Sequence, residues 1–254
     1  MNGFEFLREA NSYFFPRTPR AALKAIEEGL LPDVAYLYKA ISVSPLYEDV
    51  NKIEEIIPDI ERILSNESNE LGTNLLLMSI FEQLLGHKDQ EIALFAAESI
   101  NAIENQYNER IEKLKKELAG DDPSGARRGI ARQFYEVARI NDTRPAIKRF
   151  YLAESYAYLK ELYRNGKFRK DDIQLTVDVL VALELPDRAR YILERIKGDS
   201  KDDPDMLMLR AAVEFKAKRF SGVAEIMDRV KQKSRYIDRE RQDLVKLWIE
   251  ARDA

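Results

Sequence analysis

The chain has no cysteine among its 254 residues and only one histidine. Disulfide bonds, thiolate nucleophiles and cysteine-ligated metal sites are therefore excluded, and one histidine cannot supply a zinc site that needs two. Glycine and proline, which interrupt regular structure, number only 10 and 9. Leu, Ala, Glu, Lys, Arg and Ile dominate, and no segment alternates between apolar and polar residues as a strand would. The composition therefore predicts an all-α protein.

Long apolar runs are also missing from the sequence. The longest one, at positions 75–78, is far shorter than the roughly 20 residues of a membrane-spanning helix. The first residues, Met1 to Glu5, show neither the basic segment nor the apolar segment of a secretory signal. We expect a cytoplasmic protein with no direct membrane insertion.

The usual motifs of catalysis are absent as well. His87 stands in the turn Gly86-His87-Lys88-Asp89, where a surface or capping histidine is expected rather than a catalytic base. The segment 120–125 has the glycine spacing of a phosphate-binding loop, but it continues with Ala126 and Arg127 where Lys and Ser or Thr are needed. We interpret it as a linker, with Ser124 as a helix N-cap. The sequence therefore predicts no enzyme, no cofactor and no metal site.

A spacing of 34 residues is the main positive signal in the C-terminal third. Five positions recur at that distance, and four of the five pairs are apolar on both sides: Val177 with Ala211, Leu180 with Glu214, Ala189 with Val223, Leu193 with Met227 and Ile196 with Val230. This period resembles that of the tetratricopeptide repeat, which implies antiparallel helix pairs that bury a core by stacking on one another. Residues 126–254 are interpreted in this way, with helices near 126–140, 145–165, 171–184, 186–197, 204–218, 220–233 and 237–252.

The N-terminal part has a different pattern. Residues 89–100, DQEIALFAAESI, place an Asp at a helix cap, an aliphatic residue three positions on, a pair of alanines and a further aliphatic residue. This pattern resembles the second helix of a HEAT repeat, and we interpret residues 1–119 as a HEAT-like region. Its other helices are expected near 3–13, 18–29, 33–43, 46–64 and up to Leu85. Together the two parts predict an α-solenoid of stacked antiparallel helix pairs.

Charge is distributed unevenly along the chain. Residues 1–126 carry 12 Lys and Arg against 23 Asp and Glu, whereas residues 127–170 carry 12 against 4, which leaves −11 and +8 respectively. The basic band 127–170 also holds eight of the 24 aromatic residues between positions 134 and 168. Most of these aromatics are expected in the core, because helices of a solenoid pack on two faces.

The cations of the basic band are the candidate partner-binding residues. Arg128, Arg132 and Arg139 recur at spacings of four and seven, and Arg149, Lys160 and Arg164 share a stripe of the following helix. Such a surface fits an acidic protein segment, the acidic half of another copy in a homo-oligomer, a polyanion or nucleic acid. Nucleic acid is the weakest of these candidates, because the whole chain carries a net charge of −4.

One narrower resemblance concerns residues 133–138, QFYEVA, and residues 149–159, RFYLAESYAYL. These segments are similar to the tetratricopeptide portion of the helical-repeat subunit of the Pel exopolysaccharide machinery. The resemblance implies a non-enzymatic scaffold that joins polysaccharide synthesis and export proteins in bacteria. The expected function is therefore a scaffold or adaptor for a partner protein, with binding of a polyanion or nucleic acid through the basic band as the alternative.

Overall fold

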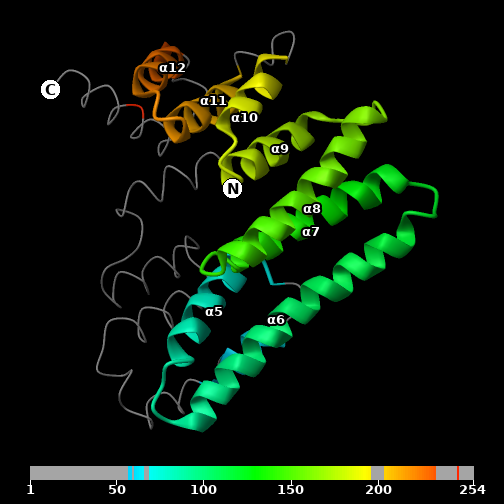
Figure 1. The fold of residues 1–254 in the computed structure, drawn as a ribbon, viewed down its shortest axis with the longest axis vertical. Helices are drawn as coiled ribbons and strands as arrows, with labels where there is room; N and C mark the ends of the chain where they lie inside the picture. The colour runs from blue at the N-terminus through cyan, green and yellow to red at the C-terminus, as the bar shows by residue number, and fades with distance from the viewer. Residues whose placement is uncertain (1–56, 59, 66–68, 196–202, 233–244, 246–254) are drawn as a thin grey trace, which may run out of the picture. The chain divides into compact units, whose positions relative to one another are not determined.

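The computed structural model describes residues 57–58, 60–65, 69–195, 203–232 and 245, and the part of the chain described there is helical without any strand. Figure 1 shows the helices in chain order. Their bounds are α5 Leu71–Leu84, α6 Gln90–Glu117, α7 Pro123–Ile140, α8 Pro145–Arg164, α9 Lys170–Ala182, α10 Pro186–Glu194, α11 Pro204–Lys216 and α12 Phe220–Gln232. The expected helices before residue 57 and the one at 237–252 lie outside the described residues, apart from Val245.

The described helices belong to two compact units. One unit contains α5, α6 and residues 136–148, and the other contains residues 122–135 together with the helices from residue 149 onward. The assignment of whole regions to 1–119 and 126–254 stays a prediction.

Helix α6 is long because one apolar stripe continues along it. The Asp89 carboxylate caps its first turn by accepting a hydrogen bond of 2.8 Å from the Glu91 amide, as the sequence pattern predicts. Six residues of the stripe are buried, namely Ile92, Ala96, Ile100, Ile103, Tyr107 and Ile111. Near the C-terminal end, Glu112 pairs with Lys115, three residues on, at 2.8 Å.

A buried polar pair joins α5 to α6. The Nδ2 of Asn74 donates a hydrogen bond of 3.0 Å to the hydroxyl of Tyr107, and both side chains are fully buried. Burial raises the pKa of the Tyr107 hydroxyl, so it remains a neutral phenol at physiological pH. The hydroxyl satisfies a donor that would otherwise be unpaired in the core, and the pair therefore fixes which residues of the two helices face each other.

Helix α7 begins one turn earlier than expected. Pro123 occupies its first position, where a missing N–H costs nothing, and Asp122 precedes it. The Asp122 Oδ1 accepts a hydrogen bond of 2.9 Å from the Gly125 amide. Asp122, and not Ser124, is therefore the residue that caps the helix, because Ser124 already lies within it. A Cβ at Gly125 would lie 2.2 Å from the Asp122 carboxylate, so a larger residue at this position requires the Asp122 side chain to move.

The 34-residue spacing is present in the helix bounds. Helix α9 begins at Lys170 and α11 at Pro204, while α10 begins at Pro186 and α12 at Phe220, and each of these pairs is 34 residues apart. Helix α9 packs on α10 and α11 on α12, and α11 also contacts both helices of the preceding pair. The described part of this unit thus contains two equivalent helix hairpins in succession (Figure 1).

The turns inside the two hairpins repeat as well. Glu184 and Lys218 have positive φ angles of 62° and 59°. After each of them, an amide reaches back to a carbonyl five residues earlier, from Leu185 to Leu180 at 2.8 Å and from Arg219 to Glu214 at 2.9 Å. This bonding is the Schellman motif, which ends a helix with one residue in the left-handed conformation.

The core positions of the hairpins correspond in burial too. Val177 and Ala211, whose equivalence the sequence predicts, are both at most 1% exposed. The same holds for Ala189 and Val223, and for Leu193 and Met227. Ile196 lies outside the described residues, and among the other four pairs only Leu180 and Glu214 differ in chemistry, because Glu214 is a buried carboxylate.

The left-handed residues give a test of the repeated turn. Lys218→Gly should raise the free energy of unfolding by about 0.5–1 kcal/mol, because glycine has no Cβ to clash in this conformation. Arg188→Gly is the control, since Arg188 is an exposed cation inside α10, and it should lower the same quantity by about 1 kcal/mol. Urea unfolding followed by circular dichroism measures both, and equal destabilisation by the two changes would contradict the assigned turn.

Candidate partner-binding surface

The structure divides the six predicted partner-binding residues into two groups. Arg132 on α7 is exposed, and so are three cations on α8: Arg149, Lys160 and Arg164. The other two, Arg128 and Arg139, are half-buried. Arg139 lies in the unit that contains α5 and α6 and makes an interaction within the fold, so it is not a free cation. The six residues therefore do not form one uniform surface.

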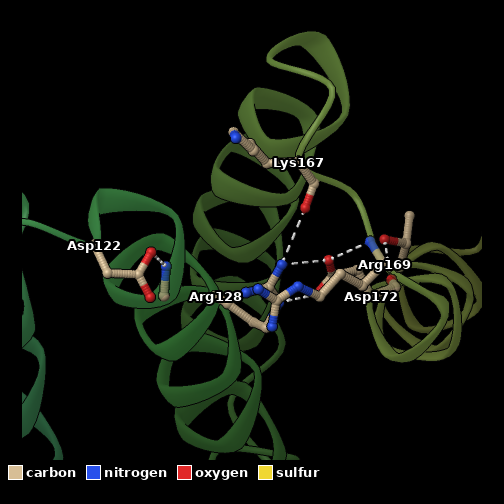
Figure 2. A network of polar contacts seen from close by, with 7 residues as sticks. Asp122, Arg128, Lys167, Arg169 and Asp172 are labelled. Carbon is tan, nitrogen blue, oxygen red and sulfur yellow. Dashed lines mark hydrogen bonds and ion pairs between the residues drawn. The ribbon is translucent and has the colours of Figure 1, made fainter.

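Arg128 on α7 forms hydrogen bonds to Asp172 on α9 and to the segment that follows α8, as Figure 2 shows. We call this network the clasp. The Nε and Nη2 of Arg128 donate to the two carboxylate oxygens of Asp172, at 2.5 and 2.9 Å. Its Nη2 also donates to the carbonyl of Lys167, just beyond the end of α8, at 3.1 Å. The hydrogen bond to Asp172 raises the pKa of Arg128, so the guanidinium remains charged. We leave Arg128 out of the surface proposed below, because its donors are used inside the fold.

Asp172 is the buried half of this clasp. Its side chain is 1% exposed, and Oδ2 also accepts a hydrogen bond of 2.8 Å from the amide of Arg169, the residue before α9. The carboxylate thus caps α9 and neutralises Arg128 at the same time. A buried carboxylate needs such partners, because desolvation without them costs several kcal/mol.

Other cations of the basic band also have partners within their own unit. Arg127 pairs with Glu161 at 2.9 Å, Arg144 with Glu104 at 2.8 Å, and Lys170 with Asp203 at 2.6 Å. Lys148 pairs with Asp142. The hydrogen bond to Asp203 raises the pKa of Lys170, which keeps this ammonium charged. Glu161 and Asp142 are already counted in the net charge of +8, whereas Glu104, Asp203 and the Asp172 partner of Arg128 come from outside the basic band and offset three of these charges.

The exposed cations of α8 lie along its outer side. At 100° per residue, an arc of about 80° carries five exposed residues between Arg149 and Arg164. We call it the α8 face, and it consists of Arg149, Ala153, Ala157, Lys160 and Arg164. Two exposed aromatics flank it, Phe150 at 59% exposure and Tyr163 at 57%. The three charged residues make no side-chain interaction with any other described residue. The α8 face is therefore cationic, and its charged side chains are exposed to a partner.

The remaining aromatics of the basic band stabilise the fold. Phe134 and Tyr135 are buried, and Phe134 packs against Tyr151 and Tyr158 of α8 with ring centroids 5.9 Å apart in both pairs. Ser155 of α8 is also buried and donates a hydrogen bond of 2.7 Å to the carbonyl of Ala131 on α7. The inner side of α8 is thus anchored to α7, which leaves Phe150 and Tyr163 as the aromatics open to a partner.

A small pocket lies between α10, α11 and α12. Its volume is about 200 Å³, and Leu193, Val213 and Ile226 form its apolar floor. Three arginines and three glutamates complete its lining: Arg190, Arg210, Arg229, Glu194, Glu214 and Glu225. Their formal charges cancel, and Glu214 is held by Arg190 at 3.4 Å and Arg219 at 3.0 Å. This pocket therefore offers no preference for a ligand of either charge.

Side chains that could hold a metal ion are not brought together in the described part of the chain. No group of three or more His, Asp or Glu residues there could hold a metal ion. His87 accepts a hydrogen bond of 3.1 Å at Nδ1 from the amide of Asp89, the residue that caps α6. None of the described helices combines the length and apolarity that crossing a membrane requires.

Comparisons of the chain with protein-family models, curated proteins and solved structures found no match. The proposals below therefore depend on the residues and geometry of this chain.

Proposed function

We propose that the chain is a non-enzymatic helical-repeat adaptor that binds an acidic segment of a partner protein on the α8 face. The observation that carries the proposal is the α8 face itself, where three exposed cations and two exposed aromatics lie on one helix. Exposed charges of one sign attract a partner of the opposite sign, and exposed aromatics supply the contact energy.

The helix pairs support a tetratricopeptide-like interpretation of the C-terminal unit. The repeated bounds, turns and buried positions of α9–α10 and α11–α12 are what a stacked repeat requires. In the proposal, the unit with α5 and α6 is HEAT-like, and the whole chain is a cytoplasmic α-solenoid. The resemblance of residues 133–159 to the Pel subunit suggests an exopolysaccharide synthesis and export assembly as the setting.

Charge reversal on the α8 face tests the proposal. The variant with Arg149→Glu, Lys160→Glu and Arg164→Glu should bind a glutamate-rich peptide at least about tenfold more weakly than the parent, because three attractive pairs become repulsive. It should also fail to retain partners during affinity purification from the native host. Helicity should not change, since exposed charges contribute little to folding.

The matched control places the same charge change elsewhere. Arg188, Lys218 and Lys231 are exposed cations of the same unit, and their replacement by Glu also changes the net charge by −6. This variant should bind like the parent. If the two variants weaken binding equally, the effect is one of net charge and the α8 face is not the site.

Binding of a polyanion or nucleic acid is the second candidate function. Phe150 and Tyr163 favour it, because exposed aromatics beside cations can stack on bases. The net charge of −4 opposes it. Binding of a single-stranded oligonucleotide, measured beside that of the glutamate-rich peptide, separates the two candidates, since only the second predicts that the exposed aromatics stack on bases.

A further inference from the structure

Helix α6 carries an exposed acidic side that no interaction described above uses. Residues 90–109 contain four glutamates and no Lys or Arg. Glu104 is occupied by Arg144, but the other three, Glu91, Glu98 and Glu109, are exposed and fall within about 20° of one another around the helix. None of the three side chains is paired with a described residue.

An exposed leucine lies on the same side of α6. Leu94 is 59% exposed and follows Glu91 by three residues, which places it beside the acidic stripe. Exposed Ala102 and Asn105 continue the surface toward Glu109. We call this surface the α6 face, and it consists of Glu91, Leu94, Glu98, Ala102, Asn105 and Glu109. It combines three anions with one apolar contact point.

The α6 face and the α8 face are complementary. The α8 face runs from Arg149 to Arg164, about 22 Å along the helix axis, and the α6 face runs from Glu91 to Glu109, about 27 Å. Three cations with two aromatics thus meet three anions with one leucine over similar lengths. The alanines at 102, 153 and 157 leave room for the two helices to approach closely.

We propose that the α8 face of one copy binds the α6 face of a second copy, so that the chain self-associates head to tail. This inference rests on the proposed function, because it takes the α8 face as the binding surface and names its occupant. The contact is heterologous, because one copy uses its α8 face and the other copy uses its α6 face. Each copy of such a pair still has one free face, which can bind a further copy. Such a contact produces rings if it closes and open chains if it does not.

The contact consists of exposed charges at a helix surface, so its strength should depend on salt. Exposed ion pairs contribute little each, and salt screens them over a Debye length of about 10 Å at 0.1 M. Self-association of the full chain should therefore be weak, and high salt should reduce it by about tenfold. Sedimentation velocity over a range of protein concentrations and salt measures this.

A charge exchange between the two faces tests the pairing directly. The α8 variant has Arg149→Glu, Lys160→Glu and Arg164→Glu, and the α6 variant has Glu91→Lys, Glu98→Lys and Glu109→Lys. Each variant alone should sediment as a monomer. An equimolar mixture should associate again, because the acidified α8 face of one variant meets the basic α6 face of the other. A chain with all six substitutions should also associate, which shows that the substitutions do not unfold it.

The outcomes separate this inference from the proposed function. If the parent is monomeric at all concentrations, or if the mixture stays monomeric while circular dichroism shows folded variants, the self-association inference is wrong. If such a monomeric parent still binds the glutamate-rich peptide through the α8 face, the proposed function stands with a different occupant. If the α8 variant also binds that peptide like the parent, both fail.

Discussion

Arg128→Met should lower the free energy of unfolding by about 3–5 kcal/mol, the cost of breaking a buried ion pair by removing one partner. The Asp172 carboxylate, 1% exposed, would lose both hydrogen bonds from the guanidinium and keep only the one from the Arg169 amide. The Lys167 carbonyl would lose its donor as well. Equilibrium unfolding in urea, followed by circular dichroism, measures the change.

The neighbouring arginine provides a matched control. Arg127 is also ion-paired across helices, but its partner Glu161 is 54% exposed. Arg127→Met should therefore cost at most about 1 kcal/mol, because solvent replaces what the carboxylate loses. The contrast depends on the burial of the acid, since both arginines sit in the same turn of α7. Equal costs for the two changes would contradict the assigned role of Asp172.

Removing both partners of the clasp refines the test. In Arg128→Met combined with Asp172→Leu, no buried charge is left without a partner, although the cap of α9 is lost. The double variant should therefore be more stable than Arg128→Met alone. The loss of unfolding free energy in the double variant is compared with the losses in Arg128→Met and in Asp172→Leu. If it equals their sum, Arg128 and Asp172 do not stabilise the fold as a pair.

The repeated hairpins could be predicted from the sequence, because apolar periodicity is a local property. The positions Val177 and Ala211 follow from spacing alone, and the helix starts at Pro186 and Pro204 follow from proline at a first helical position. The same rule applied to Pro123 would have indicated Asp122 as the N-cap instead of Ser124. Proline at position 123 is therefore the local sequence signal for this cap.

The clasp could not be predicted in the same way. Arg128 and Asp172 are 44 residues apart, and nothing in the local spacing pairs them. Asp172 is the third residue of α9, where an acidic side chain indicates a capping box only if the N-cap residue is Ser, Thr, Asp or Asn. In this chain the N-cap residue is Arg169. Net charge along the chain therefore located the basic band, but the number of its cations that remain free depends on tertiary pairing.

The α8 face could be predicted from the sequence in part. The stripe of Arg149, Lys160 and Arg164 was predicted from helical spacing, and the structure places all three at the exposed side of the helix. The acidic side of α6 is not among the surfaces predicted from the sequence, since only the cations of the basic band were considered as binding residues. The absence of Lys and Arg from residues 90–109 was the signal that could have found it.

Truncating the equivalent core residues of the two hairpins should also have a large effect. Leu193→Ala and Met227→Ala should each lower the free energy of unfolding by about 2–5 kcal/mol, because each side chain is at most 1% exposed and its removal leaves a cavity. Leu193 packs among residues of α9 and α11, whereas Met227 belongs to a core cluster of α11, α12 and Val245. Thermal and urea unfolding measure both variants.

Exchanging the two residues tests whether the positions are equivalent. In Leu193→Met and Met227→Leu, each hairpin receives the residue of the other, and the side-chain volume is nearly conserved. If the 34-residue repeat places both side chains in the same environment, each exchange should cost less than about 1.5 kcal/mol. An exchange as damaging as truncation to alanine would mean that the two hairpins share a backbone pattern but not a common packing.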